Sequence, residues 1–330
     1  MENSIDIFLS IIIPCYNVSD YIDSCIDSLK CQNANIPTEF IFVNDGSKDN
    51  TLEHLLSFKE QDKRVVVINK KNEGVSAARN DALKIAKGKY VYLLDGDDFI
   101  SDDAVSVIYE NLHDFKADVL ITNLFYRIKD KNIKYDNGLL PGSYTSNQLF
   151  NSVQVFPTPP QNVYKLSIIK ENEILFNTKL KVGEVYDFTV RYLQFAHKIE
   201  VIKNSIYYYV MHSLSATHKP NYDNDITVID TLKNLYSIEA EYKTAISFHI
   251  TAFKIATSFT YNKYVLNGLD TKNAIFVIKS LLKDSIFKQI VHQIIFENHR
   301  DFKERCKAIY IQILGLFGFR MLTLIRKLLK

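Results

Sequence analysis

The sequence predicts an α/β fold in which a doubly wound, mostly parallel sheet is followed by a helical C-terminal extension. In roughly the first third of the chain, short runs rich in Ile and Val alternate with amphipathic runs, which is the pattern of βαβ units. Beyond Lys219 the hydrophobic pattern is that of helices up to the last residue. A chain of 330 residues with 47% apolar content is also long enough to bury a substantial core.

Buried strands are expected wherever a short apolar run is bounded by turn residues. Such runs occupy residues 9–13, 38–43, 64–69 and 90–94. The intervening helices are expected to begin near Ser19 and at Asp49 or Asn50, which are capping residue types. A third helix is expected over residues 75–86, ending before Gly88.

The alternation of strands and helices weakens from about Phe125. Asn-Gly at residues 137 and 138 predicts a hairpin, and residues 157–160 predict a proline-rich loop. We therefore expect an α/β domain over residues 1–215 and a helical region over residues 216–330.

Composition limits the compartment and the classes of partner. The formal net charge is only +2, so bulk electrostatics do not indicate a nucleic-acid partner. The spacing of the four cysteines is not that of a zinc site, and it favours a reduced, cytoplasmic compartment. These cysteines are Cys15, Cys25, Cys31 and Cys306. The first residues do not have the pattern of a signal peptide, and no run of about 20 uncharged apolar residues predicts a membrane-spanning helix.

Polar side chains follow each of the four predicted strands. Open parallel sheets bind ligands beyond the carboxyl ends of their strands, so these residues are expected to converge on one edge. They are Pro14, Cys15, Tyr16 and Asn17, then Asn44, Asp45, Gly46 and Ser47, then Lys71, Asn72, Glu73 and Gly74, and finally Asp95, Gly96, Asp97 and Asp98.

The acidic loop after the fourth strand indicates a metal site. Carboxylates as close as Asp95, Asp97 and Asp98 repel one another, and a hard divalent cation removes that repulsion. Mg²⁺ or Mn²⁺ characteristically bridges one or two carboxylates to diphosphate oxygens. The alternative interpretation is an acidic turn that caps a helix beginning near Asp102.

Two further residues of this edge suit a nucleotide. Asp45 is able to accept hydrogen bonds from the imide of uracil or from an amino group of another base, and its alternative role is an Asx-turn. Residues 72–80 open a helix, and a helix N-terminus with an arginine nearby, Arg79, favours a diphosphate. The alternative partner of Arg79 is a carboxylate of the sheet edge.

The segments SIIIPCYN, EFIFVNDGSKDNT and NEGVSAARNDALKIAKGKYVYLLDGDD resemble, in order and spacing, the family 2 inverting glycosyltransferases of the GT-A fold. The resemblance is specific over residues 8–100 and looser up to residue 215. A nicotinamide dehydrogenase would need G-x-G-x-x-G where this chain has PCYNVS, and a nucleotidyltransferase would need a glycine-rich, basic loop there. Both alternatives are therefore set aside.

The resemblance implies a GT-A catalytic domain over residues 1–215, with a nucleotide-sugar half over residues 1–125 and an acceptor half over residues 126–215. It also implies that Arg79 contacts the phosphates, Asp95 the ribose and Asp97 the metal ion, Mn²⁺ or Mg²⁺. The nucleobase of the donor would be held by Pro14, Tyr16, Asn17 and Asp45. The residues expected to bind the nucleotide sugar are Pro14, Tyr16, Asn17, Asp45, Ser47, Asn72, Gly74, Arg79, Asp95 and Gly96.

An inverting transfer needs a base that takes the proton of the attacking hydroxyl. In the family this base usually lies in a Glu-Asp pair that starts a helix in the second half, but Val185 stands at the aspartate position here. Glu184 is our first choice as the base, and Asp187 is the second catalytic candidate. The alternative role of Asp187 is to pair with Arg191 one turn later.

A tyrosine-rich segment over residues 206–215 also resembles the family. His212 within it, or His218 after it, is placed to complete the metal site or to touch the diphosphate. A solvated loop histidine is the alternative interpretation of either residue.

The last residues, 308–330, are largely apolar with a narrow polar stripe. This pattern suits an interfacial helix that brings the chain to an anionic membrane face, and equally a helix that packs on the catalytic domain or on a dimer partner. An interfacial helix would make the chain a peripheral membrane protein, whereas a helix that packs on a partner would make it a homodimer.

The resemblance implies a hexosyl- or N-acetylhexosaminyltransferase that moves a sugar from a nucleotide diphosphate, preferentially UDP, to an acceptor hydroxyl. A glycan or lipid-linked glycan of a bacterial surface is the acceptor class that it implies. The alternative, which Val185 suggests, is a pseudo-transferase that binds a nucleotide sugar or a glycan without turnover.

Overall fold

The computed structural model describes residues 6–114, 117–136, 138–152, 159–212, 227–237, 276 and 279–297. The chain forms two compact units. The first unit comprises Met1–Ser146, Pro157–Thr178 and Phe188–Met211, and the second comprises Asn147–Phe156, Lys179–Asp187 and His212–Lys330.

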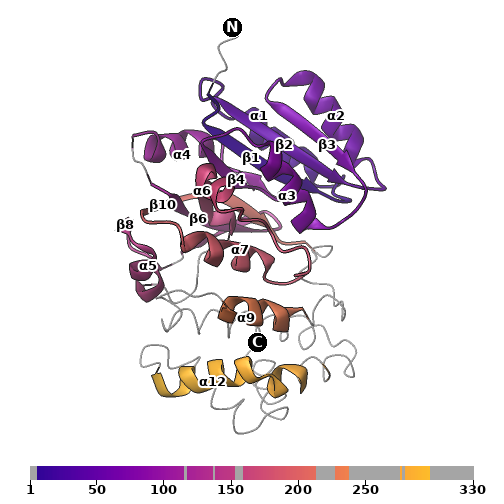
Figure 1. Cartoon of the computed structure of the whole chain (residues 1–330). Coiled ribbons are helices and arrows are strands. Elements are labelled where there is room, and N and C mark those ends of the chain that lie inside the picture. Colours follow the sequence, from indigo (N-terminus) through magenta and orange to yellow (C-terminus); the bar gives the residue numbers. More distant parts are fainter. Residues whose placement is uncertain are drawn as a thin grey trace. The chain divides into compact units, whose positions relative to one another are not determined.

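The first unit contains a 10-stranded sheet with the order β3-β2-β1-β4-β9-β6-β10-β5, in which β7 pairs with β6 and β8 pairs with β10 (Figure 1). Its N-terminal part is parallel and consists of β1 (Leu9–Cys15), β2 (Thr38–Asp45), β3 (Val65–Lys70) and β4 (Tyr90–Leu93). The four predicted strands are therefore confirmed. Strands β1 and β2 continue to Cys15 and Asp45, beyond the expected ends at residues 13 and 43.

The remainder of the sheet mixes parallel and antiparallel pairs. β10 (Ile199–Val210) runs parallel to β6 (Val119–Ile128), while β9 (Asn162–Lys165) lies antiparallel between β4 and β6. The short antiparallel strands are β5 (Phe99–Ile100), β7 (Lys131–Tyr135) and β8 (Gly142–Tyr144).

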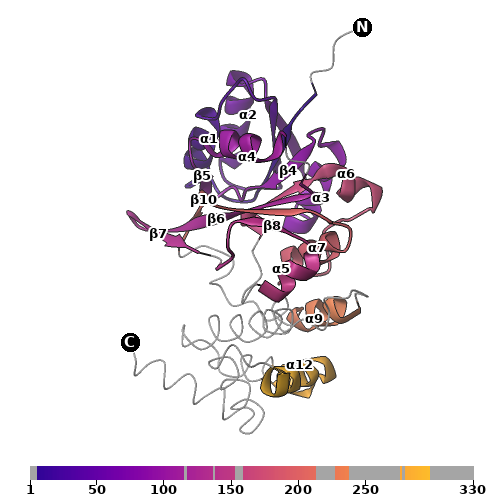
Figure 2. The same cartoon turned by 90° about the vertical axis from the view of Figure 1, so that its left-hand side faces the viewer.

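Helices cover both faces of the parallel part of the sheet. One core cluster joins Ile11 and Ile13 of β1 to apolar side chains of α1 (Ile22–Lys30), α2 (Thr51–Gln61) and α4 (Ala104–Leu112), which Figure 2 shows together on one side. Ile12 points the opposite way because strand side chains alternate. Helix α3 (Val75–Ile85) packs on that opposite face against β1 and β2. The sheet is thus doubly wound, as predicted.

Helix α1 begins later than the capping residue Ser19 suggests. Its N-cap position is Tyr21, and no side chain caps it. The backbone N–H of Ser19 donates instead to Asp49 Oδ2 at 3.0 Å, so Ser19 belongs to the loop before the helix. Helix α2 begins at Thr51 after Asn50, as expected.

The hairpin expected at residues 137 and 138 lies elsewhere. The antiparallel pair is β6 with β7, and the chain turns between them at Lys129, whose φ of 53° is left-handed. Strands β7 and β8 pair with different neighbours, so the segment around Gly138 connects them without forming a hairpin. Asn137 itself and residues 153–158 of the proline-rich loop lie outside the described residues.

The remaining helical elements begin at or beyond residue 146. They are α5 (Ser146–Ser152), a 3₁₀ turn (Pro159–Gln161), α6 (Leu166–Glu171), α7 (Glu184–Leu193), α9 (Val228–Ser237) and α12 (Ser285–Glu297). Within the second unit, α9 contacts α12. The described residues beyond residue 219 are helical apart from Thr227 and Asp284, whereas residues 308–330 and His218 lie outside the described residues.

None of the helices in the described ranges combines the length and the apolar character that crossing a bilayer requires.

Candidate functional site

The carboxyl ends of β1, β2 and β3 lie side by side, which brings their loops together. In the parallel register Cys15 pairs with Asn44, and Asn44 pairs in turn with Asn69. The Asn44 amide also donates to Asn69 Oδ1 at 2.8 Å. The predicted convergence of polar residues on one edge of the sheet is therefore present in the first unit.

The loops after β1 and β2 bind each other through Asn17 and Ser47. The Asn17 N–H donates to Ser47 Oγ at 3.1 Å, and the Lys48 N–H donates to Asn17 Oδ1 at 2.8 Å. Asn17 has a φ of 52°, a left-handed conformation that asparagine tolerates better than most residues. Tyr16, next to it, is 46% exposed and is thus able to contact a ligand.

Asp49 holds the same two loops together, a role that sequence reasoning did not assign to it. Its carboxylate accepts from the Ser19 N–H at 3.0 Å and from the Thr51 hydroxyl at 2.6 Å, while the Val18 N–H donates to Thr51 Oγ1 at 3.0 Å. Burial opposes ionisation of Asp49, but the hydrogen bonds from Thr51 and Ser19 outweigh it and lower the pKa to about 2.

Asp45 fixes the loop between β3 and α3. The side chain is 3% exposed, and its two oxygens accept from the Glu73 N–H at 2.9 Å and the Gly74 N–H at 2.8 Å. An ionised carboxylate offers about four lone-pair sites, so two acceptor positions remain for a ligand. The observed contacts reach across the sheet edge and differ from those of a local Asx-turn.

Glycine is required where these two loops approach each other. Gly46 has a φ of 72°, and a Cβ atom on it would lie 2.7 Å from the backbone nitrogen of Asn72. This contact places Asn72 beside the turn that follows β2, and the hydrogen bond from the Gly74 N–H to Asp45 places Gly74 there as well.

Arg79 pairs with a carboxylate of the sheet edge, which is the alternative that the sequence left open. Its guanidinium is almost fully buried, and Nη2 donates to Asp95 Oδ1 at 2.8 Å. The side chain of Asp95 is 33% exposed, so this ion pair borders solvent. A phosphate at the same place would meet an arginine that is already oriented.

The acidic loop lies against β1. A Cβ atom on Gly96 would approach Cys15 Sγ to 2.9 Å and the Pro14 carbonyl to 3.1 Å. The Asp98 N–H donates to the Asp95 carbonyl at 3.0 Å, which closes the turn. The alternative role as a helix cap is not observed, since β5 intervenes and α4 begins at Ala104.

Asp98 anchors this loop to β10. Its carboxyl is 2% exposed and accepts from the Tyr207 hydroxyl at 2.5 Å and from the Val210 N–H at 2.7 Å. The Tyr207 hydroxyl in turn accepts from the Asp95 N–H at 3.3 Å. Burial raises the pKa of Asp98 well above its usual range, and the charges of Asp97 and Asp95 add to this rise. The sequence places Asp98 in the loop but does not reveal that the Tyr207 hydroxyl donates a hydrogen bond to it.

The residues at the acidic loop suit a cation only if the cation takes further ligands from a substrate. Among the described residues, no three histidine, cysteine, aspartate or glutamate side chains are grouped so that they could hold a metal ion. Mg²⁺ is typically held by one or two carboxylates plus phosphate oxygens and water, which fits a loop with Asp95 and Asp97.

The three other candidates belong to the second unit. Glu184 is the first residue of α7, Asp187 lies one turn later and is 1% exposed, and His212 follows the end of β10. Their roles stay predictions.

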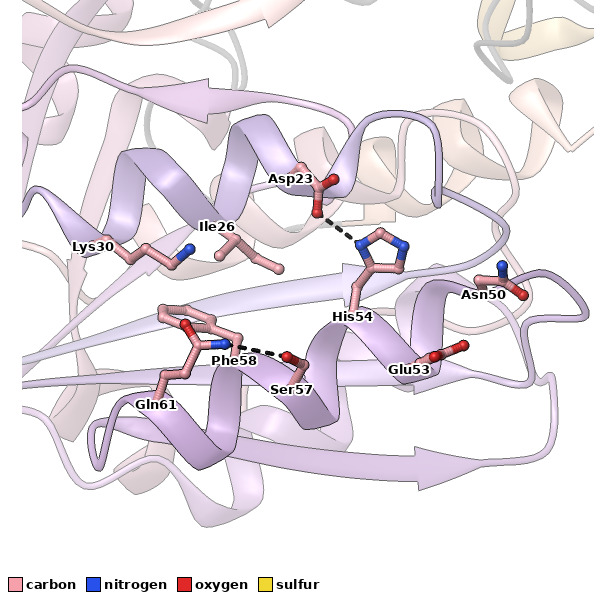
Figure 3. A pocket seen from close by; sticks show the side chains of 9 residues that line it. All are labelled: Asp23, Ile26, Lys30, Asn50, Glu53, His54, Ser57, Phe58 and Gln61. Carbon is pink, nitrogen blue, oxygen red and sulfur yellow. Dashed lines mark hydrogen bonds and ion pairs between the residues drawn. The ribbon is translucent and has the colours of Figure 1, made fainter.

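A shallow depression lies outside the predicted site. It has a volume of about 390 Å³ between α1 and α2, and Asp23 Oδ1 accepts a hydrogen bond from His54 Nδ1 across it at 2.7 Å (Figure 3). None of the predicted nucleotide-sugar residues lines it.

Residues 10–172 match the family model described as glycosyl transferase family 2. The poly(ribitol-phosphate) beta-glucosyltransferase of Bacillus spizizenii is 35% identical over 208 residues, which cover 62% of this chain and 32% of the relative's length. The chain thus spans about a third of that relative.

Two solved structures are also similar. TarS residues 1–349 from S. aureus, in complex with UDP, has a TM-score of 0.73 and 21% identity over 98% of this chain and 92% of that chain, and TarS is also solved with UDP-GlcNAc. The mannosyltransferase PcManGT from Pyrobaculum calidifontis, with GDP-Man and Mn²⁺, has a TM-score of 0.58 and 12% identity over 97% of this chain and 88% of that chain. The segment over residues 10–172 therefore belongs to glycosyl transferase family 2, and the chain has the GT-A fold that it shares with these structures.

Proposed function

We propose that this chain is a glycosyltransferase that moves a hexose or N-acetylhexosamine from a UDP-sugar to an acceptor hydroxyl with inversion. The observation that carries the proposal is the convergence of four strand-end loops on one edge of the first unit. Asn17, Asp45 and Asp49 join the first three loops, and the Arg79–Asp95 ion pair joins the fourth. Membership of family 2 and the fold shared with TarS, whose structures hold UDP and UDP-GlcNAc, support it.

In this proposal the nucleotide lies along the sheet edge. The uracil nucleobase is held by Pro14, Tyr16, Asn17 and Asp45. A remaining lone pair of Asp45 accepts a hydrogen bond from the uracil imide. Asp95 binds the ribose, and Ser47, Asn72, Gly74 and Gly96 shape the loops around the donor. The buried Arg79, already oriented by Asp95, donates to the diphosphate.

We assign Asp97 to a divalent cation, Mn²⁺ or Mg²⁺, with His212 as a further metal-site candidate. The ion would neutralise charge on the leaving diphosphate. The Mn²⁺ in the PcManGT structure supports this assignment by fold similarity alone.

Glu184 is the proposed base, with Asp187 as the second candidate. Glu184 is half-buried at the start of α7 and so less enclosed than Asp187, which is buried. Glu184→Gln is expected to retain UDP binding and to lower turnover about 100-fold or more, because the amide cannot accept the proton. Turnover within a few-fold of wild type would exclude Glu184.

The proposal also includes a place of action. Residues 1–215 would form the catalytic domain, and residues 216–330 a helical region that carries the protein to the cytoplasmic face of the membrane or into a homodimer. The acceptor would be a glycan or a lipid-linked glycan of the bacterial surface. The name of the Bacillus spizizenii relative, a poly(ribitol-phosphate) glucosyltransferase, supports this acceptor class.

A screen of donors tests the proposal. The unfolding temperature and the release of UDP are measured with UDP-, GDP- and dTDP-sugars, with and without Mn²⁺. We expect one UDP-sugar to stabilise the protein in a metal-dependent way and to release UDP slowly. Stabilisation without any release would favour the pseudo-transferase, and no response to any donor would contradict the proposal.

A further inference from the structure

Phe176 joins separate parts of the first unit, although it belongs to no helix or strand. It follows α6 in a connecting segment and is 2% exposed. Asn80 of α3 binds both of its backbone polar groups. The Asn80 amide donates to the Phe176 carbonyl at 2.9 Å, and the Phe176 N–H donates to Asn80 Oδ1 at 2.7 Å. One side chain thus fixes this backbone as a neighbouring strand would.

The Phe176 ring has two further contacts. The guanidinium carbon of Arg79 lies 5.3 Å from the ring centroid, within the range of a cation–π interaction. Phe188 of α7 stacks on the same ring with the centroids 4.1 Å apart and an angle of 3° between the planes. Because Asn80 holds the backbone and Phe188 packs on the ring, Phe176 presents a fixed surface to Arg79.

Arg79 is therefore ordered from two directions. Asp95 accepts from its Nη2 at 2.8 Å, and the Phe176 ring packs beside the guanidinium. A long arginine side chain loses rotamer freedom when it binds an anion, and this loss weakens binding unless the side chain is already held. A residue that orders Arg79 in advance would thus strengthen binding of an anionic ligand without touching it.

We propose that Phe176, fixed by Asn80, is a positioning residue whose ring holds the Arg79 guanidinium in the orientation that binds the donor diphosphate. This inference rests on the proposed function, which assigns Arg79 to the diphosphate. Phe176 acts through Arg79 and contacts no substrate. The competing explanation is that Phe176 only fills the core.

A matched pair of substitutions separates these explanations. Phe176→Leu removes the ring and retains apolar volume, and Phe58→Leu does the same at an equally buried phenylalanine. Phe58 also has a cation near its ring, Lys30 at 5.7 Å, and an aromatic neighbour, Phe42 at 6.0 Å, but it lines the depression between α1 and α2 (Figure 3). The control thus shares with Phe176 its burial, a nearby cation and an aromatic neighbour, but it has no link to Arg79.

We expect both variants to unfold at lower denaturant concentration than wild type. Only Phe176→Leu should weaken UDP binding, by about 3- to 20-fold, as measured by titration calorimetry with Mn²⁺ present. Equal affinities of the two variants for UDP would overturn the inference.

A double-mutant cycle supplies the readout that a merely structural role would not change. In an Arg79→Ala background, Phe176→Leu should alter the UDP affinity by less than about twofold, because the group through which it acts is absent. If Phe176→Leu weakens UDP binding by the same factor in wild type and in the Arg79→Ala background, the inference is overturned. If Phe176→Leu does not fold, Asn80→Ser replaces it in the cycle. This substitution releases the Phe176 backbone but leaves the rings of Phe176 and Phe188 in place, and the same result is expected.

The same titrations distinguish failure of the inference from failure of the proposed function. If wild type binds neither UDP nor any UDP-sugar, the proposed function is overturned and the inference falls with it. If wild type binds UDP and Arg79→Ala binds it equally well, the roles of Arg79 and Phe176 are overturned while the proposed activity stands.

Discussion

Asp49 shows how one carboxylate fixes the loops of the sheet edge. In the folded chain its hydrogen bonds from Thr51 and Ser19 lower its pKa to about 2 against an opposing effect of burial. A carboxyl whose pKa is lower when folded stabilises the protein above its unfolded pKa, and that contribution is lost as the pH falls through the folded value.

We therefore expect Asp49→Asn to reduce the free energy of unfolding at pH 7 by on the order of 1 kcal/mol, after allowance for solvent screening. The difference between variant and wild type should shrink as the pH falls from about 4 towards 2. Denaturant unfolding of both proteins across this range measures it. A difference that stays constant down to pH 2 would contradict the assigned role.

Tyr207 has a comparable role for the acidic loop, because its hydroxyl donates to the buried Asp98 and accepts from the Asp95 N–H. Tyr207→Phe leaves Asp98 Oδ2 without this donor, and we expect a loss of about 1–3 kcal/mol in the free energy of unfolding. Tyr90→Phe is the matched control, since that buried hydroxyl makes only long contacts of 3.4 Å with Leu112 and Ala117. Equal losses in the two variants would show that the link from Tyr207 to Asp98 contributes nothing specific.

At the scale of elements, the close approach of the loops after β2 and β3 depends on Gly46. Gly46 and Gly138 have similar φ values of 72° and 77°, but only at Gly46 would a Cβ atom meet a backbone atom, Asn72 N at 2.7 Å. Both alanine substitutions incur the energy of a left-handed alanine, about 1–2 kcal/mol.

Gly46→Ala should therefore destabilise the protein by about 1–3 kcal/mol more than Gly138→Ala, because it also forces the two loops apart. It should weaken UDP binding as well, whereas Gly138→Ala should not. Denaturant unfolding and calorimetry of the two variants test this difference. Equal stability of the two variants would contradict the claim that the loops after β2 and β3 are too close at Gly46 to accommodate a Cβ atom.

The parallel strands were predictable because each is a compact run of Ile, Val and aromatic residues followed by a turn. Their polar ends were harder to assign, since Asn44 and Asp45 continue the ladder of β2 despite their polarity. The late start of α1 was also hidden, because the N–H of Ser19 is bound by Asp49, 30 residues further along the chain. Local sequence does not reveal a partner at that separation.

Non-local pairing explains what the sequence did not reveal beyond about residue 125. Strand β9 inserts antiparallel between β4 and β6, and no local pattern indicates such an insertion. For the same reason Phe176 gave no signal, since its partner Asn80 lies 96 residues away. The strand-end residues were found from the sequence because a parallel sheet brings them together whatever their partners are.

At the scale of the whole molecule, the proposed donor residues and the proposed catalytic residues come from different units. Pro14 to Asp97 belong to the first unit, while the proposed catalytic residues Glu184 and Asp187 belong to the second, as does the metal-site candidate His212. Nucleotide binding should therefore respond to substitutions in the first unit and, through the cation, to substitution of His212, whereas Glu184→Gln in the second unit should lower turnover alone. This separation allows the nucleotide site to be tested without knowledge of the acceptor.

The central claim is that the edge formed by the ends of β1, β2, β3 and β4 binds a nucleotide diphosphate. A crystal structure of the chain with UDP and Mn²⁺ tests it most directly. We predict uracil between Tyr16 and Asp45, and the diphosphate between Arg79 and a cation held by Asp97. UDP bound at any other place, or an edge that stays free of nucleotide at saturating UDP, would contradict the account.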